Sequence, residues 1–300
     1  THVLTVTGKD SFDSPDQIVV SMDAGKLKVS DNGVVKTFDP AKVNKVKILA
    51  RAGNDVVDVK TTVTKPTEID TGTGGPFPEG DTVYGGGGKD TIYARSDYCG
   101  VFGRGGDDTI YLYAGTAGVD AGAGNDTVIV KGSIDRTIPG GDGVDTIDYS
   151  AFGGGMVIRN GYTGFYYHGT DDGSGLPILD TTYGDSLSAF ENFTGTQGDD
   201  FILGTSGRNV IKGVGGNDKL YGYAGNDLIY GGAGDDQLFG GNNDDALFGG
   251  AGHNALYGGD GNDYLNASNS NVSDFLSGGT GNDTGTWDAS DVVTGVEVKA

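Results

Sequence analysis

The chain has 300 residues, of which 58 are glycine. Its 42 acidic and 20 basic side chains give a formal net charge of -22, and so acidic a surface excludes nucleic acid as an expected partner. A single cysteine, Cys99, excludes an internal disulfide framework, and no stretch approaches the roughly 20 apolar residues of a membrane span.

Residues 1–49 alternate apolar and polar residues in short runs such as VLTVT, QIVVS, KLKVS and VKILA. Turn-forming residues separate the runs, and Asp31-Asn32-Gly33 is a good hairpin turn. We interpret this segment as an N-terminal β cap that covers the open end of the following repeats and blocks edge-to-edge aggregation. A ligand-binding role for it is the alternative.

Residues 50–148 contain a nine-residue repeat that begins faintly and becomes clear at Gly85. Full units, GGGGKDTIY, GRGGDDTIY, AGAGNDTVI and GGDGVDTID, start at residues 85, 103, 121 and 140. The stretches between them keep an aliphatic residue at the eighth position, for example Val101 and Val119, but carry no complete motif. Two degenerate units before Gly85 place Asp55 and Asp81 at the sixth position.

Residues 149–194 interrupt the repeats with a segment rich in aromatic residues. Tyr162, Phe165, Tyr166 and Tyr167 lie close together, next to His168. We interpret the segment as a β excursion that packs over the junction of two repeat blocks. A carbohydrate-binding or partner-binding surface is the alternative, because clustered tyrosine suits such contacts.

Residues 195–266 form eight consecutive nine-residue units without a slip in register. Position 1 is glycine in all eight, position 6 is Asp in six and Asn in two, and position 8 is always Ile or Leu. Glycines allow the first six residues to turn tightly, and the last three form a short strand with one inward aliphatic side chain. One unit cannot bury that side chain alone, so we predict two units per coil, stacked as a parallel β-solenoid.

The pattern continues after Asn266, so residues 195–300 form a second repeat block. An insertion is followed by GGTGNDTGT, and Trp287 with the run DVVTGVEVKA is expected to close the end of the solenoid. Aromatic residues at position 9 predict two outward columns, Tyr221, Phe239 and Tyr257 in one and Tyr230 and Phe248 in the other.

The unit resembles the G-G-x-G-x-D-x-U-x nonapeptide of the RTX, or haemolysin-type, calcium-binding family. The resemblance implies an all-β, right-handed parallel β-roll in which Ca2+ lies between turns stacked on one edge. It also implies that position-6 side chains and turn carbonyls supply the oxygens that this hard cation prefers. The implied ligands of the second block are Asp200, Asp218, Asp236, Asn254 and Asp274 on one edge and Asn209, Asp227, Asp245, Asp263 and Asp283 on the other.

The 18-residue spacing in the first block places its implied ligands on one edge of the coil, so we expect calcium there and a metal-free opposite edge. These ligands are Asp90, Asp108, Asp126 and Asp145, and the degenerate units add Asp55 and Asp81. Eight adjacent aspartate pairs, three in this block and five in the second, predict about eight well-formed ions, and the Asn-containing and degenerate sites add about four more. Eight divalent ions would change the formal charge from -22 to -6.

No HExxH, GxSxG or Cys/His metal spacing is present, so we expect no intrinsic active site. The preferred hypothesis is a secreted or cell-surface structural module that folds on binding extracellular calcium. The first alternative is an adhesive or self-assembling surface protein that uses its aromatic columns for self-association or carbohydrate contact. The second alternative is the non-catalytic repeat portion of a larger exoenzyme.

Overall fold

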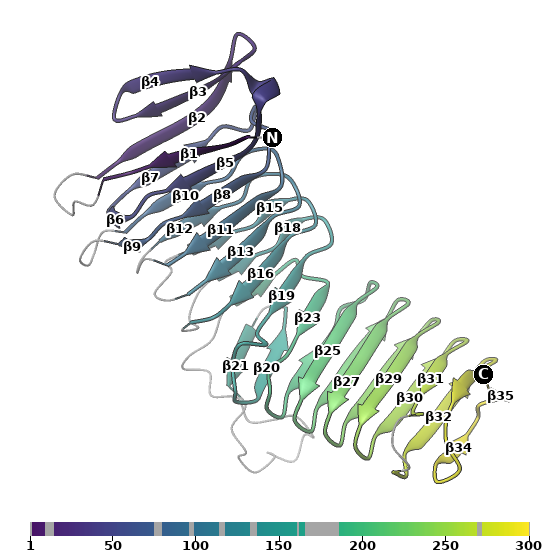
Figure 1. The fold of residues 1–300 in the computed structure, drawn as a ribbon. Coiled ribbons are helices and arrows are strands. Elements are labelled where there is room, and N and C mark those ends of the chain that lie inside the picture. Colours follow the sequence, from purple (N-terminus) through teal and green to yellow (C-terminus); the bar gives the residue numbers. More distant parts are fainter. Residues whose placement is uncertain are drawn as a thin grey trace. The chain divides into compact units, whose positions relative to one another are not determined.

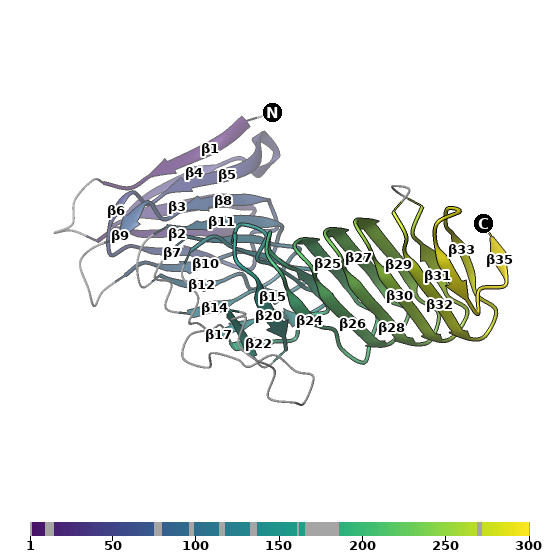
Figure 2. The same cartoon turned by 90° about the horizontal axis from the view of Figure 1, so that it is seen from below.

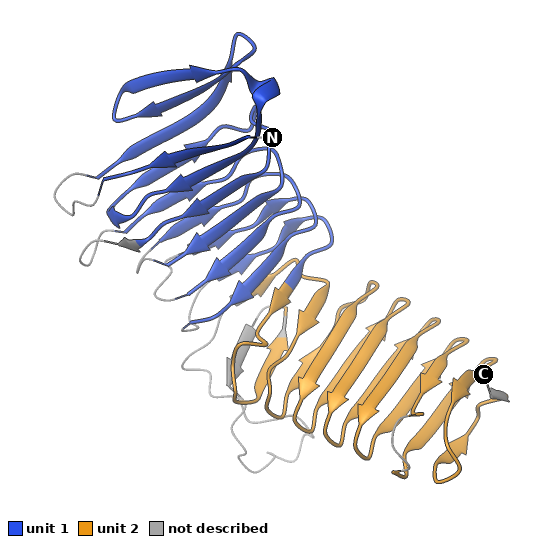
Figure 3. Ribbon diagram, viewed as in Figure 1, with its two compact units in different colours: residues 1–146 blue, residues 147–300 orange. Residues whose placement is uncertain are grey.

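The structure is a computed structural model that describes residues 2–9, 15–74, 80–95, 99–113, 118–132, 137–160, 162–165, 186–268 and 272–299. It is all-β, and its parallel strands stack as a β-solenoid, as the repeat predicts (Figure 1). The chain divides into two compact units, residues 1–146 and residues 147–300 (Figure 3). Within the described residues, no helix is long and apolar enough to cross a membrane.

Two sheets form the walls of the first unit. One sheet has the order β1 (His2–Thr7), β5 (Val43–Leu49), β8 (Thr67–Asp70), β11 (Asp90–Ala94), β13 (Thr109–Leu112) and β16 (Thr127–Val130). The other has the order β14 (Gly118–Asp120), β12 (Gly100–Phe102), β10 (Thr82–Tyr84), β7 (Val56–Val59), β2 (Gln17–Asp23), β3 (Lys26–Asp31) and β4 (Val34–Phe38). The shorter elements are η1 (Pro40–Lys42), β6 (Ala52–Gly53), β9 (Thr73–Gly74), β15 (Gly122–Ala123), β17 (Thr137–Pro139) and β18 (Gly141–Asp142), and β19 (Thr146–Asp148) begins at the last residue of the unit.

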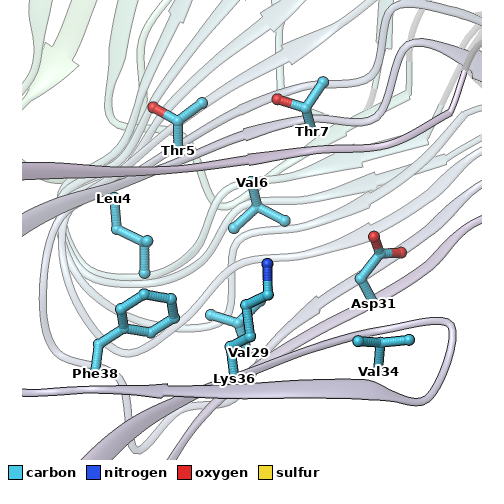
Figure 4. A pocket seen from close by; sticks show the side chains of 9 residues that line it. All are labelled: Leu4, Thr5, Val6, Thr7, Val29, Asp31, Val34, Lys36 and Phe38. Carbon is cyan, nitrogen blue, oxygen red and sulfur yellow. The ribbon is translucent and has the colours of Figure 1, made fainter.

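The N-terminal end of this unit combines parallel and antiparallel pairing. β1 pairs in parallel with β5, whereas β3 pairs in antiparallel fashion with β2 on one side and with β4 on the other. Leu4 and Val6 of β1 point toward Val29 and Phe38, and with their neighbours they line a cavity of about 200 Å3 (Figure 4). The hairpin strands β3 and β4 therefore form the end of the second sheet, and they face β1 of the first sheet across this cavity.

The parallel strands of the first unit pair in a register that keeps equivalent repeat positions together. Thr91, Thr109 and Thr127 are paired in β11, β13 and β16, and the aliphatic residues that follow them form a buried column. Val101 and Val119, in the stretches that lack the full motif, are 0% and 4% exposed. The position-8 column therefore continues through both kinds of stretch.

The second unit repeats this architecture with a more regular coil, and Figure 2 shows its strands side by side. One sheet continues from β23 (Asn192–Thr194) through β25 (Val210–Gly215), β27 (Leu228–Ala233), β29 (Ala246–Ala251), β31 (Tyr264–Asn266) and β33 (Thr284–Thr286) to β35 (Val298–Lys299). The other has the order β21 (Tyr162–Phe165), β20 (Met156–Arg159), β24 (Phe201–Leu203), β26 (Lys219–Ala224), β28 (Gln237–Asn242), β30 (Ala255–Asp260), β32 (Phe275–Thr280) and β34 (Val292–Thr294), and β22 (Ser186–Ser188) is a short further strand.

The core of the second unit is one aliphatic residue wide on each sheet. The position-8 side chains are fully buried, namely Ile202, Ile211, Leu220, Ile229, Leu238, Leu247, Leu256 and Leu265. Outside the core, Phe239 stacks between Tyr221 and Tyr257 with ring centroids 4.5 and 4.9 Å away, and Tyr230 stacks on Phe248 at 4.9 Å. The predicted position-9 columns are therefore confirmed.

Part of the excursion joins the second unit. β20 pairs in parallel with β24 and in antiparallel fashion with β21, and Tyr149, Phe190 and Phe193 are fully buried. Tyr166, Tyr167 and His168 lie outside the described residues, and the side chains of Tyr162 and Phe165 are not described either. The aromatic surface proposed for this segment therefore stays a prediction.

Candidate metal centre

The position-6 side chains lie where each turn meets the strand that follows it. The backbone N–H of a position-6 residue donates to the Oδ1 atom of the position-6 side chain one coil later. Asp218 N–H donates to Asp236 Oδ1 at 2.8 Å, and Asp90 N–H donates to Asp108 Oδ1 at 2.7 Å. This contact repeats from coil to coil, so the acidic side chains form continuous ladders.

We number four ladders, two in each unit. Ladder 1 contains Asp16, Asp55 and Asp81, and ladder 2 contains Asp90, Asp108, Asp126 and Asp145. Ladder 3 contains Asp200, Asp218, Asp236, Asn254, Asp274 and Asp291. Ladder 4 contains Asn209, Asp227, Asp245, Asp263, Asp283 and Glu297.

Every predicted ligand is a buried member of a ladder, and none is more than 3% exposed. The grouping in the second unit follows the two edges that the repeat register predicts. In the first unit, ladder 1 precedes the strands of the second sheet and ladder 2 precedes those of the first sheet. The degenerate units at Asp55 and Asp81 therefore occupy the edge opposite to the one expected for ladder 2.

The second carboxylate oxygen, Oδ2, has a different environment from Oδ1. In most ladder residues it is buried and, within the described part of the chain, accepts no hydrogen bond. These residues are Asp55, Asp108, Asp126, Asp218, Asp227, Asp236, Asp245, Asp263, Asp274 and Asp283. A buried carboxylate oxygen without a donor is costly unless a cation or a proton satisfies it.

Position-1 glycine is required because the carboxylate of the same turn lies against it. A Cβ added to Gly103 would lie 2.7 Å from Asp108 Oδ2, and one added to Gly85 would lie 2.8 Å from Asp90 Oδ2. A real Cβ does not approach another atom so closely, so any side chain would displace the carboxylate. This contact explains why position 1 is glycine in all eight units of the second block.

Turns with an unsatisfied Oδ2 share a second feature wherever position 2 lies within the described residues, namely a positive φ at that position. Glycine fills many of these positions, but Arg104, Val214 and Tyr223 adopt φ values of 73°, 91° and 77° there. Such values are unusual for residues with a side chain, and for a β-branched residue such as Val214 they are strained. The position-2 and position-4 carbonyls of successive coils lie in columns. A Cβ on Gly250, at position 2, would lie 2.9 Å from the Gly232 carbonyl carbon, and one on Gly252, at position 4, would lie 2.6 Å from the Gly234 carbonyl carbon.

Two Asp turns are closed instead. Asp90 Oδ2 accepts the Gly86 N–H at 2.6 Å, and Asp200 Oδ2 accepts the Thr196 N–H at 2.6 Å. Gly86 and Thr196 occupy position 2 and have no positive φ. These turns begin ladders 2 and 3, so a ladder starts with a turn in which protein donors satisfy the carboxylate.

Burial raises the pKa values of the ladder carboxyls above the usual range for Asp. Burial first, and neighbouring ladder carboxylates after it, raise the pKa of Asp108 and of Asp218 to about 8. Burial likewise raises the pKa of Asp200 and of Asp245 to about 7. Without a counter-ion, Asp108 and Asp218 therefore favour the protonated carboxyl near neutral pH in the folded chain.

The arrangement fits a hard cation held mainly by oxygen. Within the described residues, no three carboxylate, imidazole or thiol side chains converge on one point. A cation would therefore bind one or two ladder carboxylates and complete its shell with turn carbonyls. Calcium, which takes six to eight oxygens in flexible geometry, suits such a donor set.

Several ladder members follow from the structure and not from the repeat register. Asp16 is fully buried and begins ladder 1, and Thr67 donates its hydroxyl to Asp90 Oδ1 at 2.6 Å at the start of ladder 2. Asp291 and Glu297 accept the last N–H groups of ladders 3 and 4. Asp16 and Asp291 each lie two residues before an aliphatic residue, as a position-6 residue does. This spacing would have identified them from the sequence.

Position 5 forms a second, outer set of contacts that the sequence did not suggest. Here the direction is reversed, because an N–H of one coil donates to a side-chain oxygen of the preceding coil. Asn217 N–H donates to Asp199 at 2.7 Å, and Asp235 N–H donates to Asn217 at 2.8 Å. Asp or Asn at position 5 therefore ties neighbouring turns together.

The fold and the ladders define a repeat protein whose stacked turns present acidic and carbonyl oxygens to cations. A comparison with protein families matches the RTX calcium-binding nonapeptide repeat at residues 79–97, 101–128, 194–229, 203–238, 212–247, 239–272 and 269–284. The chain therefore carries RTX calcium-binding nonapeptide repeats in both units, repeats of this kind bind Ca2+, and their solenoid is a structural fold without catalytic machinery. A search of curated proteins found no match.

Proposed function

We propose that this chain is a calcium-binding structural module that folds, or becomes rigid, when Ca2+ enters its ladders. The observation that carries the proposal is the row of buried Oδ2 atoms without hydrogen-bond donors. The ten such atoms named above would destabilise the folded chain if they stayed charged and unpaired. Ca2+ between successive turns would satisfy them and their neighbouring carbonyls together.

The energetics of the coil favour strong coupling between binding and folding. Each unit of the second block buries one aliphatic side chain, while glycine loses more backbone freedom on folding than any other residue. The hydrophobic gain per coil is therefore small for the number of residues ordered. Binding free energy is available to the folded state alone, because the unfolded chain has no stacked turns.

The proposed ligands are the ladder residues, used in adjacent pairs. Eight pairs supply the expected count of about eight ions. Their charge of +16 would change the formal net charge from -22 to -6. The pairs are Asp90/Asp108, Asp108/Asp126, Asp126/Asp145, Asp200/Asp218, Asp218/Asp236, Asp227/Asp245, Asp245/Asp263 and Asp263/Asp283. Neutralisation would remove most of the repulsion between the ladders.

We propose an extracellular or cell-surface location on the same grounds. Sites built from few carboxylates and many carbonyls have modest affinity, and extracellular modules work with Kd values of about 10^-4 to 10^-3 M. Such sites would stay empty at the lower calcium level inside cells. We also propose that the chain itself is not an enzyme.

The test is a calcium titration of the chelated protein, followed by far-UV circular dichroism and sedimentation velocity. The proposal requires a gain of β signal together with compaction of the monomer over the same calcium range. Magnesium at equal concentration is the control, because its demand for octahedral geometry suits these turns poorly. A chelated chain that is fully folded and insensitive to calcium would refute the proposal.

A second candidate function is self-assembly, and one observation favours it. Among the exposed large hydrophobic side chains of the described residues, Val3, Val34, Val35 and Val292 lie on β1, β4 and β34, the outermost strands of their sheets. Outermost strands with exposed apolar side chains are suited to pairing with another copy. Calcium-dependent growth beyond the monomer in the same sedimentation experiment would support this candidate, and a monomer at all concentrations would contradict it.

A further inference from the structure

Asn254 stands in ladder 3 where its neighbours are aspartates, and its amide makes different contacts from theirs. Its Oδ1 accepts the Asp236 N–H at 3.0 Å, as a ladder aspartate would. Its Nδ2 donates to the Gly250 and Gly252 carbonyls at 3.2 and 3.3 Å. These two carbonyls belong to positions 2 and 4 of the same turn.

The Asn254 Nδ2 atom occupies the place that Oδ2 has in an aspartate turn. A Cβ on Gly249 would lie 2.9 Å from Asn254 Nδ2, and a Cβ on Gly231 would meet Asp236 Oδ2 in the same way. In the Asn254 turn, a donor therefore faces two carbonyl oxygens. In the Asp236 turn, a charged acceptor takes that place, and oxygen facing oxygen is favourable only with a cation between them.

Two further turns of the second unit contain a donor in the same region. The Thr196 hydroxyl lies 3.0 Å from Asp200 Oδ1 and 3.4 Å from the position-4 carbonyl of Gly198. The Thr205 hydroxyl makes the same contact with the position-4 carbonyl of Gly207 at 3.4 Å. The Asn209 amide of that turn donates to the Glu191 carbonyl at 2.6 Å.

We propose that the side chains of Thr196, Thr205 and Asn254 take the place of a cation, so that their three turns hold no ion. The inference rests on the proposed function and refines it, because it separates turns that bind Ca2+ from turns that the chain stabilises by itself. It removes the Asp200/Asp218 pair from the eight pairs proposed above, because Asp200 belongs to the Thr196 turn. The first turn of each ladder in the second unit is then independent of calcium. Asn254 divides ladder 3 into two separate calcium-binding runs.

The first test moves the amide into a calcium-binding turn. Asp263 has glycines at positions 2 and 4 of its turn, as Asn254 has, and its Oδ2 is without a donor. Asp263→Asn and Asp263→Ala both remove the carboxylate, but Asp263→Asn keeps an oxygen for the Asp245 N–H and also supplies donors for the Gly259 and Gly261 carbonyls. Both variants should bind fewer ions per chain than the wild type.

The two variants should differ in the calcium concentration at the folding midpoint. We expect Asp263→Asn to keep this midpoint within about twofold of the wild type, and Asp263→Ala to raise it about tenfold. Equal increases in both variants would overturn the inference, because the amide would then replace nothing.

The reverse test restores a carboxylate. Asn254→Asp should increase the number of bound ions by at least one, measured by equilibrium dialysis at saturating calcium. Asn262→Asp is the matched control, because it adds the same charge at position 5, where the side chain faces the outer contacts of Asp244. The control should leave the ion count unchanged.

The outcomes separate the two levels of the argument. A wild-type chain that binds no calcium would refute the proposed function itself. A wild type that binds calcium, together with an Asn254→Asp variant that gains no ion, would refute the inference alone. An equal gain in Asn254→Asp and Asn262→Asp would also overturn it, because charge and not position would then decide binding.

Discussion

Two glycines in neighbouring repeats should respond to the same substitution with opposite signs. A Cβ on Gly213, at position 1, would lie 2.6 Å from the Gly231 carbonyl oxygen and 2.8 Å from Asp218 Cγ. A Cβ on Gly207, at position 4, would meet nothing nearer than Thr205 Oγ1 at 3.8 Å. Gly207 also lacks the positive φ of most position-4 glycines. The structure therefore forbids alanine at Gly213 and permits it at Gly207.

The size of the two effects follows from these contacts. Forcing a methyl group against backbone and carboxylate costs about 1–3 kcal/mol, and Gly213→Ala also displaces a carboxylate from its ladder. Gly207→Ala should stabilise the chain by about 0.4–1 kcal/mol, because alanine lowers the conformational entropy of the unfolded state. For a unit of this size, we expect Tm to fall by about 5–10 °C in Gly213→Ala and to rise by about 1–3 °C in Gly207→Ala.

Thermal unfolding at saturating calcium, followed by far-UV circular dichroism, measures both shifts. Repeating the measurement with chelator separates the loss of an ion from the steric clash, because the clash destabilises the chain in either condition. A Tm reduction of equal size in the two variants would refute the reasoning. It would mean that glycine is needed in these turns for flexibility in general and not for the particular approach of the carboxylate.

Three further predictions concern the metal-free chain, the core and the aromatic columns. Burial raises the pKa of Asp108 and Asp218 to about 8 in the folded chain, so the metal-free folded state binds more protons than the unfolded state. Its stability should therefore rise as pH falls from 8 toward 4. Circular dichroism of calcium-free protein that shows no more β structure at pH 5 than at pH 8 would contradict this prediction. Leu247→Ala should lower the free energy of unfolding by about 2–5 kcal/mol, measured by chemical denaturation at saturating calcium, because Leu247 is fully buried. A smaller loss than that caused by Tyr223→Ala, at an exposed position, would count against a one-residue-wide core. Phe239→Ala should lower the unfolding free energy by about 1–2 kcal/mol through loss of stacking with Tyr221 and Tyr257, and no change would show that the column is a surface feature without structural weight.

The sequence was sufficient to predict the solenoid because two independent periodicities coincide in it. Position-8 residues such as Leu238 mark the core, and position-6 residues such as Asp236 mark the ladder two residues earlier. A short strand fixes the distance between these positions, so either pattern predicts the other. The stacking register then follows, since glycine at position 1 leaves room both for the carboxylate of its own turn and for a carbonyl of the next coil.

Other features were not predictable because they depend on contacts between coils. Asp16 occurs in a segment without glycine repeats, and it reaches ladder 1 because β2 pairs with β7. Asn254 and Asn209 look equivalent in the repeat, yet the Asn254 amide donates to two carbonyls of its own turn, whereas the Asn209 amide donates to the Thr205 hydroxyl and to the Glu191 carbonyl of the preceding coil. The partner of each amide depends on which coil precedes it, and a repeat motif does not record this.

The two carboxylate oxygens of a ladder aspartate have separate tasks, and this division links the fold to the cation. Oδ1 accepts an N–H from the neighbouring coil and so contributes to stacking with or without metal, as Asp245 does at 2.8 Å from Asp227 N. In most ladder aspartates of the described ranges, Oδ2 faces the turn and has no donor there, Asp90 and Asp200 being exceptions. A carboxylate that is half satisfied by protein ties neighbouring coils together through Oδ1 but leaves the buried Oδ2 without a donor, which costs free energy. On the proposed function, calcium supplies the missing stability at each such turn, and on the further inference an amide or hydroxyl, as at Asn254 and Thr196, takes over that role locally.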